Sequence, residues 1–394
     1  MAEGELEERK RRIFGFFKKN SKSEDSDSIS NSETKEERGR SDTIEIRKEK
    51  LTGIFKQAEW IYYPFLLIII WISIYVRKRN LDKIIPGALP TDPDSALFYR
   101  WAEIIVQQGH LPVIDTMRYV PLGFDTFAES RFFSYSLAWL YKIIHVVNSK
   151  VTLLQVDMLY PIILTPFIII AFFFLIKKIF DWRIALVASA FLAVMPAFLQ
   201  RTMLGFSDKE PLGMLFFFLS LYFFVSGWKE TKLKIAALYG ALAGLFTGLL
   251  GLTWGGVDFI FMTIGLATFM LFFFGNFNRK DFAVYIVWLI FMTAVLTIFS
   301  TRYSIIGLVS SFPSAVAYFP LPQFIIFFLA EKRYKALRMP LQFFSIFVAL
   351  VIGIAAMTLL NLAYFGNLNF FLTLFSQLRL KFLSYVFLIK LPLY

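Results

Sequence analysis

Long runs of apolar residues constrain the fold of this chain more than any other feature. They are roughly 17 to 25 residues long, the length with which a helix crosses a hydrocarbon layer about 30 Å thick. With 57% hydrophobic residues and 48 Phe among 394 residues, the chain holds more apolar material than a soluble domain of this length buries. The polar and apolar alternation of barrel strands is absent from the sequence. It therefore predicts an all-α polytopic membrane protein.

The apolar runs predict about nine transmembrane helices, with boundaries uncertain by several residues. The expected spans are 60–76, 153–176, 184–199, 211–227, 235–254, 257–275, 282–300, 305–329 and 340–364. The stretch 131–147 is also apolar, but it is short and is interrupted by Arg131, Lys142 and His145. It is predicted to be an amphipathic helix at the membrane interface.

Basic residues predict the orientation, because loops rich in Lys and Arg stay in the cytoplasm. With the N-terminus in the cytoplasm, the basic clusters at 177–183, 229–234, 279–280 and 332–338 all fall inside. Counting 131–147 as a span would move all four outside. The exception is 77–79 (RKR), which the longer basic stretch before the first span outweighs. The long loop 77–152 and the short loop 200–210 are then predicted to face outward.

The chain divides into three predicted parts. Residues 1–52 mix both charge signs with a Ser-rich stretch and form a disordered cytoplasmic tail. Residues 53–364 form the membrane domain, and 365–394 form an outer-loop segment. The net charge of +12 then lies mostly in the membrane part as an orientation signal, and nucleic acid is not an expected partner. With no Cys and two His, the chain offers neither a thiolate nor a histidine-rich metal site.

The membrane part also contains a stretch of small residues and two acidic residues within predicted spans. The glycine-rich stretch 240–256 predicts close helix packing, with a lipid or ion pathway as the alternative. Asp157 and Asp258 lie near the outer ends of their spans, where either could line a polar cavity.

Two acidic segments lie in the predicted outer loops. The first is 92–95 (DPDS), before a predicted amphipathic helix at 96–107, and its simplest interpretation is that Asp94 or Ser95 caps that helix. Asp92 is a helper at most.

The second acidic segment is 201–211 (RTMLGFSDKEP), in which Asp208 is expected to cap a helix with Pro211 in its first turn. Each segment alone is explained by capping. Together on one membrane face they are more informative, because hard divalent cations need carboxylate oxygens from different segments.

These segments resemble the catalytic subunit of the archaeal and bacterial oligosaccharyltransferases. The resemblance rests on Arg-Thr-Met-x-Gly-Phe-x-Asp-x-Glu after the third span and on Asp-Ser-(four residues)-Arg in the first outer loop. It runs from about Trp60 to the end and includes 119–123 (YVPLG). Those enzymes belong to the GT-C membrane glycosyltransferases and transfer a lipid-pyrophosphate-linked glycan to asparagine. The resemblance implies a GT-C-like helical bundle with interfacial helices in the first outer loop. It also implies membrane lipids, a polyprenyl-linked oligosaccharide donor and an acceptor polypeptide as partners.

The resemblance also implies roles for single residues. Asp94 and Asp208 match metal ligands, and Glu210 matches an acid close to the metal or to its water shell. The implied ion is Mg²⁺ or Mn²⁺, which offsets the charge of a diphosphate leaving group. Arg201 matches an Arg near the same site, and Arg201 and Lys209 can contact phosphate oxygens. For Lys209, a cation that snorkels to the interface is an equal alternative.

Two features of the family are missing from the sequence. No acid follows the ninth span, where the family places a Glu near the metal, and the motif Trp-Trp-Asp-Tyr-Gly is absent. The chain is therefore expected to be truncated, or to be half of a split enzyme whose other half is a second chain. It is expected not to glycosylate alone.

Three other functions compete with this interpretation. A GT-C glycosyltransferase that uses a lipid monophosphate sugar would share the helices and an outer acidic motif. A non-catalytic transmembrane subunit is the second alternative. A transporter is disfavoured because the spans show no repeat and no charged pair near the bilayer midplane.

Overall fold

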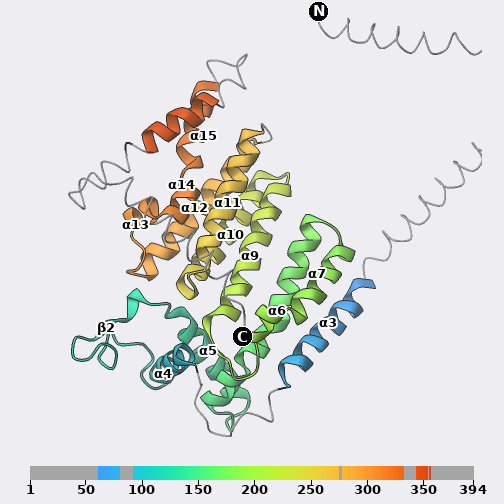
Figure 1. The fold of residues 1–394 in the computed structure, drawn as a ribbon, viewed down its shortest axis with the longest axis vertical. Helices are drawn as coiled ribbons and strands as arrows, with labels where there is room; N and C mark the ends of the chain where they lie inside the picture. The colour runs from blue at the N-terminus through green and yellow to red at the C-terminus, as the bar shows by residue number, and fades with distance from the viewer. Residues whose placement is uncertain (1–60, 80–91, 275–276, 332–342, 354, 356–394) are drawn as a thin grey trace, which may run out of the picture. The chain divides into compact units, whose positions relative to one another are not determined.

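The computed structural model describes residues 61–79, 92–274, 277–331, 343–353 and 355. Within them the chain is helical apart from turns, loops and one small β-ribbon (Figure 1). The predicted tail at 1–52 and the predicted outer-loop segment at 365–394 lie outside the described residues.

The described parts of the predicted spans are helical apart from short breaks and span ends. The helices are α3 (Tyr62–Arg77), α6 (Leu153–Ile179), α7 (Trp182–Val194), α8 (Pro196–Gln200), α9 (Lys209–Lys229), α10 (Leu233–Thr253), α11 (Val257–Phe273), α12 (Arg279–Phe299), α13 (Ile305–Ser310), α14 (Phe312–Tyr318) and α15 (Pro320–Glu331). In the described part, five helical stretches are long and apolar enough to cross a membrane, and they match the second, fourth, fifth, seventh and eighth predicted spans. The other four predicted spans correspond to shorter apolar helices, so the number nine stays a prediction.

Prolines interrupt two spans that the sequence predicts as continuous helices. In the third span, α7 ends at Val194, and Met195 is extended (φ −61°, ψ 122°) before Pro196 begins α8. The eighth span is divided into α13, α14 and α15, with Pro313 in the first turn of α14 and Pro320 at the start of α15. The residue before a proline disfavours the helical conformation, which explains the extended Met195 at the first break. Pro313 and Pro320 lie in the first turns of α14 and α15, where the missing N–H of proline costs no helical hydrogen bond.

Close packing joins α9, α10 and α12. A Cβ atom on Gly240 would lie 2.6 Å from the Val284 carbonyl oxygen, so the backbones of α10 and α12 touch. Thr247 accepts a hydrogen bond from Trp288 Nε1 at 2.9 Å, and its hydroxyl lies 2.6 Å from that of Ser220 on α9. The close helix packing predicted for 240–256 is therefore confirmed for its helical part.

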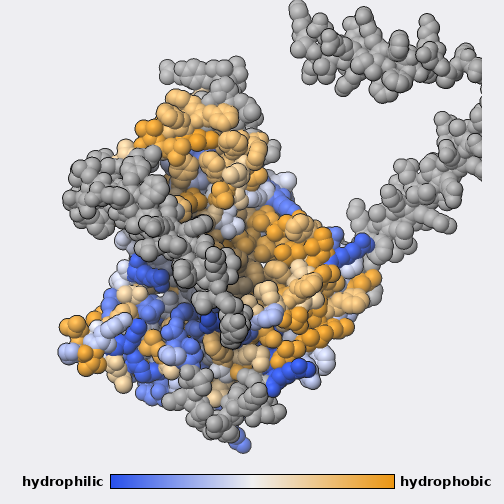
Figure 2. Space-filling model, viewed as in Figure 1, coloured by the Kyte–Doolittle hydropathy of each residue, from blue (hydrophilic) through white to orange (hydrophobic). Residues whose placement is uncertain are grey.

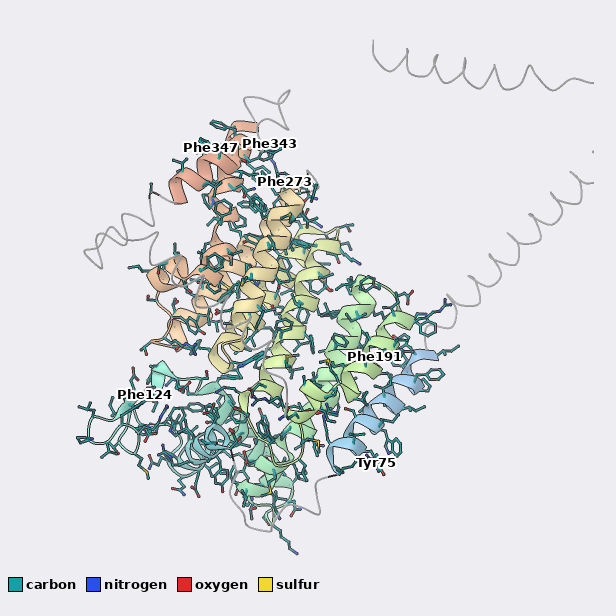
Figure 3. All side chains as sticks on the ribbon, viewed as in Figure 1. Tyr75, Phe124, Phe191, Phe273, Phe343 and Phe347 are labelled. Atoms are coloured by element: carbon teal, nitrogen blue, oxygen red, sulfur yellow. The ribbon has the colours of Figure 1, made fainter. Side chains whose placement is uncertain are left out.

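Apolar side chains cover much of the outer surface of the helices. Phe191 on α7 is 72% exposed and Tyr75 on α3 is 55% exposed, and both project from their helices (Figure 3). Figure 2 shows a broad apolar surface over α3 and α7, whereas hydrophilic atoms gather near α4. Exposed apolar surface of this extent suits helices in contact with lipid.

The first loop folds into two helices and a short ribbon. Helix α4 (Pro93–Gln108) and helix α5 (Phe132–Val147) confirm the two predicted loop helices. Between them, β1 (Ile114–Asp115) and β2 (Phe124–Asp125) pair antiparallel, with Ile114 opposite Asp125, and a 3₁₀ turn (Thr126–Ala128) follows. Strands of two residues are too short to give a sequence pattern, so they were not predicted.

Helix α5 is apolar on two faces. Phe133 and Leu137 are fully buried against the rest of the protein, whereas Ile143 is 65% and Val146 is 87% exposed. A helix of this kind suits the interface between bilayer and water, and that location of α5 stays a prediction.

Candidate functional site

The first acidic segment forms the N-terminus of α4. Asp92, and not Asp94 or Ser95, is the N-cap: its Oδ2 accepts hydrogen bonds from the backbone N–H of Asp94 at 3.1 Å and of Ser95 at 3.2 Å. The capping role expected for Asp94 or Ser95 is therefore wrong. Pro93 provides the physical reason, since proline favours the first helical position and moves the cap to the residue before it. The carboxylate of Asp94 is left free for other contacts and is 56% exposed.

The second acidic segment ends at the N-terminus of α9. Asp208 is the N-cap, and its Oδ1 accepts a hydrogen bond from the backbone N–H of Lys209 at 2.7 Å. Pro211 lies in the first turn of α9, so the predicted cap is confirmed. Asp208 is only 2% exposed, so its carboxyl group is buried at the helix N-terminus.

Lys209 connects the two acidic segments. Its Nζ lies 2.6 Å from Asp94 Oδ2, although the two residues are 115 positions apart in the sequence. The same Nζ lies 5.2 Å from the centre of the Phe98 ring on α4. The N-termini of α4 and α9 therefore lie close together. The carboxylate of Asp94 contacts the ammonium group of Lys209, which follows Asp208 in the chain.

Arg201 and Glu210 complete the cluster. Arg201 Nη1 lies 3.6 Å from Glu210 Oε1 and 4.0 Å from Asp208 Oδ2. The carboxyl groups of Asp208 and Glu210 lie against each other. The structure thus brings together all five predicted residues: Asp94, Arg201, Asp208, Lys209 and Glu210. Their roles remain predictions.

The donor set at this cluster fits a hard divalent cation. Asp94, Asp208 and Glu210 offer carboxylate oxygens, the kind of donor that such cations prefer. Glu210 Oε2 and the Ser95 hydroxyl are buried without a hydrogen-bond partner among the described residues. Two carboxyl groups in contact, with one oxygen unpartnered, favour a cation beside them. In the described part, however, no three acidic or His side chains already surround one point. The ion pair between Lys209 and Asp94 stands between the two acidic segments.

Helix α6 contacts the second acidic segment. Gly205 takes a positive φ of 80° and donates its backbone N–H to the Met158 carbonyl oxygen at 3.0 Å. Asp157, which is 1% exposed, lies against the hydroxyl of Ser207. The sequence singles out Asp157 as a buried acid, but its contact with the acidic loop depends on how α6 packs and was not predicted.

A second ion pair lies in the first loop. Arg100 donates from Nη1 and Nη2 to the two carboxylate oxygens of Asp115, and Trp101 Nε1 donates to Asp115 Oδ2 at 2.8 Å. Burial raises the pKa of Asp115, but hydrogen bonds from Arg100, Trp101 and the Met117 backbone outweigh it and hold the pKa below its ordinary value. Arg100 is the residue that the family pattern places six residues after Asp94. Its ion pair with Asp115 holds strand β1 against α4.

The helical spans and the acidic cluster between two loops define the class of the chain, a multi-pass membrane protein with its polar site at helix N-termini. Its fold is similar to that of the Archaeoglobus fulgidus oligosaccharyltransferase in the apo form, with a TM-score of 0.62 and 21% identity. The alignment covers 85% of this chain and 40% of that one. The family model "Oligosaccharyl transferase STT3, N-terminal" matches residues 88–389. The chain belongs to this family.

Curated relatives agree with this assignment. The dolichyl-diphosphooligosaccharide–protein glycosyltransferase subunit STT3 of Saccharomyces cerevisiae is 25% identical over 196 residues, which are 47% of this chain and 26% of that protein. The dolichyl-phosphooligosaccharide-protein glycotransferase of Methanococcus voltae is 30% identical over 143 residues, which are 36% of this chain and 15% of that protein. The matches thus span about a quarter or less of these two relatives.

Two further structures bear on ligands of the archaeal relative. One shows the Archaeoglobus fulgidus oligosaccharyltransferase in complex with Zn and sulfate, with a TM-score of 0.59 and 22% identity over 76% of this chain and 40% of that one. The other shows the AglB oligosaccharyltransferase of the same organism in complex with an inhibitory peptide and a dolichol-phosphate, also at a TM-score of 0.59 and 22% identity, over 78% of this chain and 38% of that one.

Proposed function

We propose that this chain is the membrane part of an oligosaccharyltransferase catalytic subunit. It would transfer an oligosaccharide from a polyprenyl-(pyro)phosphate carrier to asparagine of acceptor proteins. The observation that supports this most is the meeting of Asp94 with the segment of Asp208 and Glu210 through Lys209. Two loops that are distant in the sequence, each carrying one of the two acidic family motifs, supply carboxylates to the same cluster. The archaeal relative has been solved with a dolichol-phosphate.

Each residue of the cluster has a proposed role. Asp94, Asp208 and Glu210 would hold Mg²⁺ or Mn²⁺, which when bound acts as a Lewis acid toward a diphosphate leaving group. Arg201 and Lys209 would contact phosphate oxygens by charge-assisted hydrogen bonds. Arg201 is half exposed, which leaves its guanidinium accessible to such a ligand. The carboxylate of Asp94, which is 56% exposed, would also accept a hydrogen bond from the acceptor amide.

The donor specificity tests this function. We expect the protein purified from its own membranes, with any copurifying chains, to glycosylate a peptide carrying an acceptor asparagine in the presence of Mn²⁺. The donor should be a polyprenyl-pyrophosphate oligosaccharide, and a monophosphate-linked sugar should give no transfer. The opposite preference would favour another GT-C glycosyltransferase. The purified chain alone is expected to be inactive, because its matches cover only about a quarter or less of the two curated relatives.

The chain is a multi-pass membrane protein, and we propose that its N-terminus is cytoplasmic and that the acidic cluster faces outward. One observation reduces the weight of the exception at residues 77–79. Arg77 is fully buried and hydrogen-bonded within the protein, so it does not act as a free outer charge. Lys78 and Arg79 remain as basic residues on the proposed outer side.

Because the chain has no Cys, single cysteines can report the orientation. A Gln108→Cys variant carries its thiol at the exposed end of α4, and Thr231→Cys carries it in the turn between α9 and α10. We expect a membrane-impermeant maleimide to label Gln108→Cys in intact cells and Thr231→Cys only after permeabilisation. The reversed labelling pattern would overturn the proposed orientation.

A further inference from the structure

The guanidinium of Arg77 is buried at the end of α3 and contacts the segment that leads to the acidic cluster. Its Nε donates to Thr202 Oγ1 at 2.8 Å, and its Nη1 donates to the Ala193 carbonyl oxygen at 2.8 Å. Nη1 also donates to the carbonyl oxygen of Ser73 at 3.1 Å. The carbon at the centre of the guanidinium lies 5.1 Å from the centre of the Phe198 ring. One side chain thus joins α3, the end of α7 and the loop after α8.

The backbone of Arg77 contacts the same loop. Its carbonyl oxygen accepts the N–H of Leu204 at 3.2 Å, two residues beyond Thr202. Thr202 in turn donates its hydroxyl to the Phe198 carbonyl oxygen at 2.6 Å. Arg201, a member of the acidic cluster, stands directly before Thr202, and Asp208 follows six residues after it. The position of both therefore depends on how this loop is held.

The chemistry of the contact favours arginine. A buried charge is costly, and the hydrogen bonds of the Arg77 side chain in the described part of the chain go to hydroxyl and carbonyl oxygens, not to a carboxylate. Its planar fork instead donates in two directions at once, to a hydroxyl and to a carbonyl of two different segments. An ammonium group on a flexible stem cannot reproduce that geometry, so lysine is not an equivalent replacement.

We propose that Arg77 is a positioning residue for the second acidic segment, acting through Thr202. By fixing residues 200–204 to α3, it orients Arg201 and Asp208 toward Asp94. Its consequence for metal binding rests on the proposed function, but the fixing of the loop does not. Thr202, in the middle of residues 200–204, thereby gains a role as the hydrogen-bond acceptor for Arg77.

A pair of substitutions at Thr202 tests this proposal in the full chain. Thr202→Val keeps the shape of the side chain but removes the hydroxyl, and with it both the acceptor for Arg77 and the donor to the Phe198 carbonyl oxygen. Thr202→Ser keeps both. A nitroxide on Gln200→Cys, the only cysteine in such a variant, reports the mobility of the loop. We expect Thr202→Val and Arg77→Lys to increase the mobility of the label and to weaken Mn²⁺ binding by about ten- to a hundredfold. Thr202→Ser should behave as the unsubstituted chain does.

Thr165→Val is the matched control, since the Thr165 hydroxyl is buried and donates only to the Pro161 carbonyl oxygen within α6. It should alter neither readout. Unchanged label mobility in folded Thr202→Val would overturn the positioning role. If the unsubstituted chain binds no Mn²⁺ while the label responds as expected, the positioning role stands and the metal assignment fails. The Thr202 pair decides the matter even if Arg77→Lys does not fold.

Discussion

If the chain acts as proposed, the Asp208→Asn variant is expected to lose glycan transfer by at least about a hundredfold. The proposed divalent ion would stabilise developing charge by several kcal/mol, and each 1.36 kcal/mol is about tenfold in rate. Asn is as good a helix N-cap as Asp, so α9 should still begin at Lys209 and the protein should stay folded. Transfer by the complex purified from its own membranes, together with Mn²⁺ binding to the chain, measures the effect. Asp94→Asn is expected to change both in the same direction.

The matched control is Asp181→Asn. Asp181 caps α7 through hydrogen bonds from the backbone N–H of Arg183 at 2.8 Å and of Ile184 at 3.0 Å, and it contacts none of the five cluster residues. The same loss of charge at this cap should leave transfer and Mn²⁺ binding unchanged. Full transfer by Asp208→Asn would instead support the alternative of a non-catalytic subunit.

The second large effect is expected at the contact between α10 and α12. A Cβ atom on Gly244 would clash with the carbonyl oxygen of Trp288 and lie 2.8 Å from Phe291 Cβ. Because a backbone carbonyl cannot rotate away as a side chain can, Gly244→Val should destabilise the bundle by about 3 kcal/mol or more. The variant should melt at a markedly lower temperature in detergent, or fail to accumulate in the membrane.

Gly353→Val provides the comparison for Gly244→Val. Gly353 is also helical, and a Cβ atom there would meet no atom of the described residues within 4 Å. The cost of valine in a helix is similar at both positions, so the difference between the two variants isolates the clash. Equal melting temperatures would show that α10 and α12 can separate without loss of stability.

Much of the architecture was predictable because apolar length and helix caps are local signals. The runs around α6, α9 and α10 gave helices close to their predicted bounds. The cap of α4 was also readable: Pro93 in the first turn points to Asp92, and the prediction of Asp94 or Ser95 overlooked it. The breaks at Pro196, Pro313 and Pro320 carried the same kind of signal.

The contacts that build the site were less predictable because they join distant segments. The sequence places Asp94 and Asp208 on one membrane face, but nothing in it pairs Lys209 with Asp94 in particular. The bonds of Arg77 to Thr202 and of Arg100 to Asp115 likewise arise only when the helices pack. The resemblance identified which acids to examine, whereas the supporting residues required coordinates.

The polar junction of Ser220, Thr247 and Trp288 has a mechanical consequence. It locks α9, α10 and α12 at a point where the glycines of α10 already press against a neighbouring backbone. The three side chains are fully buried, and satisfied buried hydrogen bonds of this kind make a contact rigid. These three helices should therefore shift as one rigid block, and the isoprenoid tail of the proposed donor would have to enter along the edges of that block, never through its middle.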